Sequence, residues 1–212
     1  MTLILGRKKG MTQVFTDDGA HIGVTIVEAG PCVVTQVRTQ ATDGYDAVQL
    51  GFDDKTEKRI RKPQRGHFKK AGTTPKAFLR EERLAKPAAV AVGDTITCDV
   101  FNPGDLVDVV GTTKGRGFAG TIKRHGFNRG PKTHGCMNYR QPGSIGASAY
   151  PSRVFKGKRM SGHYGASRET IKNLQVVRVD GDRGLLFLRG AVPGPKGGYV
   201  QVQSAKTGAK KK

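Results

Sequence analysis

GTTKGRGFAGTIKRHGFNRGPKTHGCMNYRQPGSIGASAYPSRVFKGKRMSGHYG, residues 111–165, is the stretch that decides how this chain is organised. It contains eleven Lys or Arg, twelve Gly and three His, and neither Asp nor Glu. A segment so cationic and so poor in aliphatic side chains buries too little apolar surface to offset its ordering entropy. We therefore expect this segment, called the arm below, to become ordered against a polyanion. A large folded RNA fits it best.

The charge of the remaining chain is also unevenly distributed. The 212 residues have a formal net charge of +20, which indicates a phosphate-rich partner. Residues 1–110 carry sixteen bases and fourteen acids, and eight of those bases lie between Lys55 and Lys70. A uniformly cationic solvated surface would not divide in this way. The pattern predicts a near-neutral folded part with two basic excursions.

The folded part reads as β-structure. Short β-branched runs alternate with Gly, Pro and Asp turn signals, which is typical of a small barrel and not of a βαβ fold. PKAFLREERLAK, residues 75–86, predicts the one longer helix because Pro stands near its start and Phe78, Leu79 and Leu84 share a side. The expected strands cover residues 11–16, 21–28, 32–39, 46–52, 95–100, 106–110, 174–180, 185–189 and 199–203.

The expected domain organisation is a single β-barrel domain with an insertion. Residues 1–110 and 166–205 form the barrel domain, which includes a basic excursion at 55–72 and the helix at about 75–86. Residues 111–165 form an extended arm that penetrates RNA, and residues 206–212 form a basic tail. The uncharged stretch 142–152 is expected to be the tip of the arm. Phe118 and Ile122 are expected to form a small core at its base.

Two motifs in the arm could suggest other chemistry. Residues 115–120 match GxGxxG, but the acid of a dinucleotide site is missing at ~20 residues beyond, since no acid occurs before Glu169. His134 and Cys136 resemble half a metal site without a second pair at ligand spacing. We therefore expect no cofactor, no metal and no small-molecule substrate. An enzyme is not expected, because the arm offers no carboxylate for acid–base work.

The remaining patterns concern the compartment. Three widely spaced cysteines, Cys32, Cys98 and Cys136, favour free thiols over a disulfide framework. The apolar run at the N-terminus is too short for a signal peptide, and no stretch approaches the ~20 apolar residues of a membrane span. The sequence thus predicts a soluble cytoplasmic protein without a membrane partner.

The candidate RNA-binding residues combine cations with histidines, a close-approach glycine and a stacking aromatic. In the arm they are Lys114, Arg116, Gly117, Lys123, Arg124, His125, Arg129, Lys132, His134, Tyr139, Arg140, Arg153, Lys156, Lys158, Arg159 and His163. In the excursion they are Lys58, Arg59, Arg61, Lys62, Arg65, Lys69 and Lys70. The candidate tip residues are Ser144, Ile145, Gly146, Ala147, Ser148, Ala149 and Tyr150, of which Tyr150 is expected to stack on RNA, as Tyr139 is.

Longer motifs carry a resemblance to a known family. Phe101, Asp108, Gly111, Thr113, Gly115, Arg116, Gly117, Gly120 and Arg124 fit the signature of the large-ribosomal-subunit protein three family, bacterial type. The match continues through KGRGFAGTIKRHGF, PGSIGA, RVFKGKRMSGHYG, LQVVRVD and GAVPGPKGG, and the opening GRKKGMTQVFTDDG is similar to the family's N-terminus. The resemblance covers nearly the whole chain.

This resemblance implies a translation-protein type β-barrel and a non-catalytic role. It implies binding to large-subunit ribosomal RNA and to neighbouring ribosomal proteins, and early action in subunit assembly. It also implies that the tip approaches the peptidyl transferase centre. Some bacterial relatives carry a methylated glutamine in the tip, where this chain has Ala149, and Ala147 replaces another glutamine. We therefore expect no such modification. The alternative from a different class is a chromatin-like or other DNA-binding module.

Overall fold

The computed structural model describes residues 3–16, 18–85, 87 and 89–207. They form two compact units. One contains the described residues up to Thr113 and from Arg168 onward, and the other is Lys114–Ser167. Strands dominate the first unit and helices are short, so the expected mainly β fold with a barrel is confirmed.

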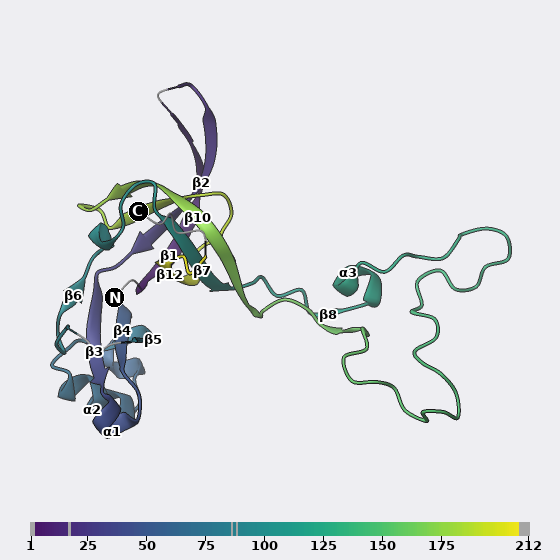
Figure 1. Ribbon diagram of the computed structural model, residues 1–212, viewed down its shortest axis with the longest axis horizontal. Coiled ribbons are helices and arrows are strands. Elements are labelled where there is room, and N and C mark those ends of the chain that lie inside the picture. The colour runs from purple at the N-terminus through teal and green to yellow at the C-terminus, as the bar shows by residue number, and fades with distance from the viewer. Residues whose placement is uncertain (1–2, 17, 86, 88, 208–212) are drawn as a thin grey trace. The chain divides into compact units, whose positions relative to one another are not determined.

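Six antiparallel strands close the barrel of the first unit (Figure 1). In spatial order they are β1 (Leu3–Phe15), β12 (Tyr199–Ser204), β7 (Leu106–Thr112), β10 (Arg168–Asp180), β11 (Leu185–Arg189) and β2 (His21–Ala29). Closure satisfies the backbone groups that an open sheet leaves at its edges. The first and last strands are neighbours, with Leu3 opposite Gln203 and Arg7 opposite Tyr199.

A second sheet belongs to the same unit. Its strand order is β5 (Lys76–Arg83), β4 (Ala47–Asp54), β3 (Cys32–Arg38) and β6 (Thr95–Ile96). The connections contain α1 (Gln40–Asp43), α2 (Lys62–Lys70), and the 3₁₀ turns η1 (Glu57–Arg59) and η2 (Cys98–Val100). Strands 32–39 and 46–52 were expected in the barrel but lie in this separate sheet.

One apolar core joins barrel and sheet. Alternate residues of the barrel strands point inward, as Val107 and Val109 of β7 and Leu186 and Leu188 of β11 do. Val34, Val48 and Leu50 of the second sheet belong to the same buried cluster. Each such side chain contributes roughly 1.5–3 kcal/mol when fully buried. The shared core makes the two sheets one folded body.

A stack of four side chains ties the sheet to the barrel at its surface. The rings of Phe78 and Tyr199 are stacked, with centroids 4.8 Å apart. The guanidinium of Arg80 lies 4.5 Å from the Phe78 ring centre, and that of Arg7 lies 5.2 Å from the Tyr199 ring centre. Tyr199 Oη donates to Asp53 Oδ2 at 2.6 Å, and Arg7 also pairs with Asp53. β1, β12, β4 and β5 are thereby connected through contacts between charged and aromatic groups.

The helix expected at about 75–86 is wrong, because Lys76–Arg83 is strand β5. Successive side chains of a strand point to opposite faces of the sheet. Phe78 faces Tyr199 of the barrel, whereas Glu81 accepts a hydrogen bond from Arg38 Nε at 3.0 Å. Pairing along β4, from Ala47 opposite Arg83 to Asp54 opposite Lys76, outweighs the helix propensity of this segment.

Other boundaries differ less. β1 starts at Leu3 and not at residue 11, and the strand expected at 95–100 is a two-residue strand followed by η2. The basic excursion contains helix α2, which was not expected. The expected strands at 21–28, 106–110, 185–189 and 199–203 are confirmed by β2, β7, β11 and β12. The basic tail lies outside the described residues from 208 on.

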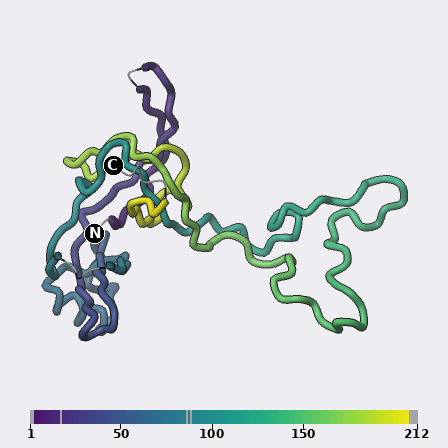
Figure 2. Tube along the Cα trace, viewed as in Figure 1, coloured from purple at the N-terminus to yellow at the C-terminus, as the bar shows by residue number. Residues whose placement is uncertain are grey.

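The second unit has little regular structure. It contains a two-stranded sheet, β8 (Phe118–Ala119) with β9 (Gly162–His163), and the five-residue helix α3 (Thr121–His125). Two further hydrogen bonds extend the pairing, from Arg116 N to Tyr164 O and from Tyr164 N to Gly117 O, each 2.9 Å. Figure 2 traces the rest of the unit, between α3 and β9, as irregular chain.

Candidate nucleic-acid interface

Helix α3 and β9 are clasped together at the base of the second unit. Arg124 Nη1 donates to the carbonyl of Met160 at 2.7 Å, and His125 Nε2 lies 3.0 Å from the same oxygen. The guanidinium of Arg124 passes over Gly162, where a Cβ would lie 2.7 Å from Nη1. α3 ends at His125 and is capped by Gly126, whose φ of 71° suits glycine. The base is thus held by hydrogen bonds and close backbone approach.

A second close approach lies at Gly130. Its N–H donates to the Tyr139 carbonyl at 3.0 Å, and a Cβ there would stand 2.3 Å from the Asn138 carbonyl oxygen. Only glycine permits this contact. This contact of Gly130 with residues 138–139 closes the base of the loop between them, and we call the contact the neck.

Beyond this neck, from residue 131 to residue 159, no side chain is fully buried. From residue 131 to residue 159 every side chain is exposed except Cys136 and Pro151, which are half-buried. Met137 is 91% exposed and Tyr150 is 90% exposed, so large apolar side chains stand in solvent. The small core expected at the base is wrong for Phe118, which is 79% exposed, while Ile122 is half-buried. Such exposure indicates that the apolar contacts of this segment are made with a partner.

The cations of the second unit have no carboxylate within the unit, because Lys114–Ser167 contains no Asp or Glu. Two guanidinium groups lie on aromatic rings instead, Arg116 on Tyr164 at 5.1 Å and Arg153 on Phe155 at 5.5 Å. This contact orients the planar guanidinium and leaves its N–H groups for an external acceptor. Phosphate oxygens are such acceptors.

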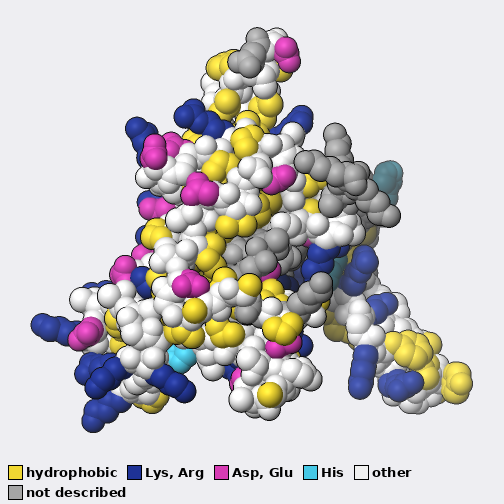
Figure 3. Space-filling model, turned by 60° about the vertical axis from the view of Figure 1, so that its left-hand side comes forward, with side chains coloured by type: hydrophobic (Ala, Val, Ile, Leu, Met, Phe, Trp, Pro, Cys, Tyr) yellow, Lys and Arg dark blue, Asp and Glu magenta, His cyan; other side chains and the backbone are white. Residues whose placement is uncertain are grey.

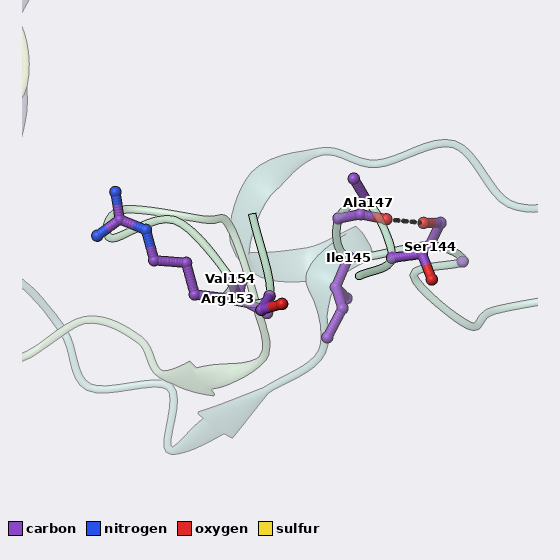
Figure 4. A pocket seen from close by; sticks show the side chains of 9 residues that line it. Ser144, Ile145, Ala147, Arg153 and Val154 are labelled. Carbon is purple, nitrogen blue, oxygen red and sulfur yellow. Dashed lines mark hydrogen bonds between the residues drawn. The ribbon is translucent and has the colours of Figure 1, made fainter. Parts of the chain in front are cut away.

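The tip of the arm surrounds a shallow hollow of about 700 Å³ (Figure 4). Ser144 Oγ donates to the Gly146 carbonyl at 2.9 Å, and Ser152 Oγ donates to the Ala149 carbonyl. Two segments of the chain line the hollow, residues 143–148 with Ile145 and residues 152–154 with Arg153. The hollow therefore offers the apolar side chains of Ile145 and Val154, the cation of Arg153 and several backbone groups.

A second basic surface lies on the first unit, around α2. Phe68 of α2 is buried at 3% exposure, and His67 Nε2 lies 2.8 Å from Gln49 Oε1, so one side of the helix is anchored to the sheet. The cations point away from that side, and Figure 3 shows them gathered at the lower left. The exposed cations of η1 and α2 and their junction are Lys58, Arg59, Arg61, Lys62, Arg65, Lys69 and Lys70.

The candidate residues of the sequence therefore fall into two groups, one on each unit. All candidate lysines and arginines are exposed except Arg124, which is half-buried by its bond to Met160. The candidate residues do not include Met137 and Phe155, which the structure leaves exposed, the latter beneath the guanidinium of Arg153. The alternation of Arg153 with Phe155 in the sequence is the signal that could have identified the latter.

The alternative sites are not formed. After Gly115–Gly120 comes a five-residue helix, and the neighbouring strand pairing is antiparallel, so the βαβ geometry of a dinucleotide site is missing there. Among the described residues no group of three His, Cys, Asp or Glu side chains could hold a metal ion. Within the same described part of the chain, no helix is long and apolar enough to span a membrane.

Comparisons with known proteins agree with the motifs of the sequence. The family model described as Ribosomal protein L3 matches residues 80–184. A protein of Pelotomaculum thermopropionicum named large ribosomal subunit protein uL3 is 56% identical over 202 residues, which cover 95% of this chain and 96% of the relative. Relatives of the same name from Synechococcus sp. (strain JA-3-3Ab) and Heliobacterium modesticaldum are each 54% identical, over 96% and 95% of this chain and 95% and 96% of their own lengths. With this identity along nearly its entire length, the chain belongs to the ribosomal protein L3 family.

Proposed function

We propose that this protein is a structural constituent of the large ribosomal subunit and binds the ribosomal RNA of that subunit through its arm and the surface around α2. It works in translation, is not an enzyme, and resides in the subunit, which is cytoplasmic in bacteria. The observation that carries the proposal is the exposed, carboxylate-free chain from residue 131 to residue 159. The name that its relatives share, large ribosomal subunit protein uL3, identifies the large ribosomal subunit as the particle to which we assign it.

The physical basis of binding is twofold. Each cation that neutralises a phosphate releases a counterion, which supplies much of the affinity and makes it sensitive to salt. Exposed aromatic side chains such as Tyr139 and Tyr150 can stack on unpaired bases, which contributes about 1–3 kcal/mol per base. RNA offers both single-stranded bases and dense phosphates, and the arm has a side chain for each.

The finer role rests on the family resemblance. The protein binds RNA early and helps to initiate assembly of the subunit, and residues 144–150 approach the peptidyl transferase centre. Neighbouring ribosomal proteins contact the first unit. The family resemblance also assigns peptide-bond chemistry to RNA, and the tip accordingly has no carboxylate, histidine or cysteine in its sequence.

The salt dependence of RNA binding tests the phosphate role. Arg116→Ala and Lys123→Ala are each expected to reduce the slope of log K against log salt by about 0.7–0.9, measured with the full chain and large-subunit RNA. Lys9→Ala is the matched control, because Lys9 Nζ already pairs with Glu28 Oε2 at 2.9 Å. Unchanged slopes for both arm variants would remove the phosphate role.

Sedimentation separates the proposal from a DNA-binding module. The protein is expected in the large-subunit fraction of a lysate gradient at moderate salt, and to prefer ribosomal RNA to duplex DNA in competition. Tight binding to duplex DNA with absence from the subunit fraction would favour the alternative.

A further inference from the structure

The β1–β2 hairpin continues beyond the barrel as a free two-stranded ribbon, which we define as residues 10–15 and 21–23 with their turn (Figures 1 and 2). β1 pairs with β12 only as far as Arg7, and β2 pairs with β11 only from Val24 onward. At the base of the ribbon the Gly190 N–H donates to the Gly23 carbonyl at 2.9 Å, and the pairing printed for residues 10–15 and 21–22 joins the two strands only to each other within the described residues. A two-stranded ribbon is marginally stable alone in water.

One face of the ribbon carries an organised apolar surface. Met11 is 58% exposed and Phe15 is 64% exposed, and they share a face because they lie four residues apart in a strand. His21 lies opposite Phe15, with ring centroids 5.6 Å apart, and its Nε2 is 2.7 Å from Gln13 Oε1. The side chains of this face thus hold one another in place before any partner binds.

The charge of the ribbon differs from that of the rest of the protein. No Lys or Arg occurs between Gly10 and Val37, although the chain has 37 of them, and the exposed Asp18 lies in the turn. Figure 3 shows the ribbon at the top, with hydrophobic side chains and an acidic end. A surface without cations gains nothing from counterion release, and its carboxylates repel phosphate. RNA is therefore the wrong occupant.

We propose that this ribbon face docks a basic protein neighbour within the large subunit, with Phe15 and Met11 packed against an apolar patch and the acidic turn against its cations. The partner's positive charge follows from complementarity with Asp18 and with a ribbon that carries no Lys or Arg to repel it. Apolar side chains at the centre with a charged rim are the usual anatomy of such interfaces. The inference rests on the proposed function, because the subunit brings the partner to the ribbon.

Site-specific photocrosslinking in purified large subunits tests this docking surface. A benzophenone side chain is introduced at Phe15, at Thr12 on the opposite ribbon face as the matched control, and at Phe155 of the arm. The expected result is a covalent adduct from position 15 with one net-positive ribosomal protein, identified by mass spectrometry. Position 12 gives much less of this adduct, and position 155 gives RNA adducts.

Several outcomes overturn the inference alone: an adduct from position 15 with RNA, with an acidic protein or with a second copy of this chain, or no adduct in subunits that contain the protein. If even the unmodified protein is absent from large subunits, the proposed function is contradicted, and so is the docking surface that rests on it. As a second measurement, Phe15→Ser is expected to weaken binding of the full chain to the purified partner by about tenfold or more. Thr12→Ala should leave that affinity unchanged, and equal affinities for both variants would contradict the proposal.

Discussion

Gly6 is required where β1 passes closest to β2. A Cβ at this position would lie 2.5 Å from the Glu28 carbonyl oxygen and 2.9 Å from Val27 Cγ1. The first of these neighbours is backbone, so it cannot move aside without disturbing the strand pairing. Gly10, four residues along the same strand, has nothing within 4 Å of such an atom.

Gly6→Ala is therefore expected to lower the free energy of unfolding by at least about 1–3 kcal/mol, the usual cost of overpacking. Gly10→Ala should be close to neutral, because it adds a methyl group to open space and restricts the unfolded chain. Thermal unfolding followed by circular dichroism compares the two. Equal melting temperatures would show that the barrel tolerates a side chain at residue 6.

Cys32 makes stability depend on pH in alkaline solution. Its Sγ lies 3.3 Å from both the N–H and the carbonyl oxygen of Leu5, and burial raises the pKa of this thiol from 9.0 to about 11. The folded state thus favours the protonated thiol. This contribution is fully present below pH 9 and is lost as the pH rises to about 11.

Wild type is expected to lose up to about 2–3 kcal/mol of its stability relative to Cys32→Ala between pH 8 and pH 11. Urea unfolding of both proteins across this range measures the difference, and lysine titration cancels between them. A difference that stays constant with pH would mean that Cys32 keeps an ordinary pKa in the fold.

Strand β5 illustrates how an element depends on its neighbours. Residues 76–83 contain good helix formers, and Phe78 and Leu79 are adjacent and not alternating. β4 supplies backbone partners along the whole length of β5, and Tyr199 supplies a ring for Phe78. Neither partner can be recognised from the local sequence. The local sequence therefore favours a helix, and that prediction is wrong.

The arm divides into two parts with different internal support. At its base, backbone bonds connect Arg116 with Tyr164, and α3 is clasped to Met160. From residue 131 to residue 159 the side chains are exposed, except the half-buried Cys136 and Pro151, and this stretch contains no helix or strand. We therefore expect the base to keep its structure without RNA, and the exposed part to need RNA to fix its conformation.

Hydrogen exchange should reveal this division in the free protein. The amides of Arg116, Tyr164 and Gly126, which donate to backbone carbonyls, are expected to exchange more slowly than those of residues 140–154. Binding of large-subunit RNA should then protect residues 140–154. Protection of that stretch without RNA, or no protection with it, would contradict the division.

The first unit has what it needs to fold without the second. Its core is continuous from the barrel into the second sheet, and the four-side-chain stack joins their surfaces. β7 and β10 pair as neighbours, with Thr112 directly opposite Arg168. The two ends of the insertion are therefore already at the distance that a tight hairpin turn spans.

Replacement of residues 113–167 by Asn-Gly is expected to leave the first unit folded. Its melting temperature should stay within about 4 °C of the wild-type value, the shift that about 1 kcal/mol produces in a protein of this size. Incorporation into large subunits should be lost, because the arm carries more of the candidate RNA-binding cations than the surface around α2 does. An unfolded or aggregated product would mean that the barrel depends on the arm.

The sequence by itself determined the β character of the first unit and the special nature of the arm. Alternation of side chains in segments such as 21–28 and 199–203 is a local property, and so is an acid-free run of 55 residues. The identity of the candidate RNA-binding cations and their exposure follow from the same local chemistry, while their contacts with RNA stay a prediction.

Only the tertiary structure decided which strands are neighbours. Closure of the barrel brings Leu3 against Gln203 across the whole chain, and β3, β4 and β5 leave the barrel for a sheet of their own. It also made residues 76–83 a strand and left Phe118 in solvent. The physical reason is that pairing and burial are energies between segments distant in sequence, so the composition of either segment alone does not contain them.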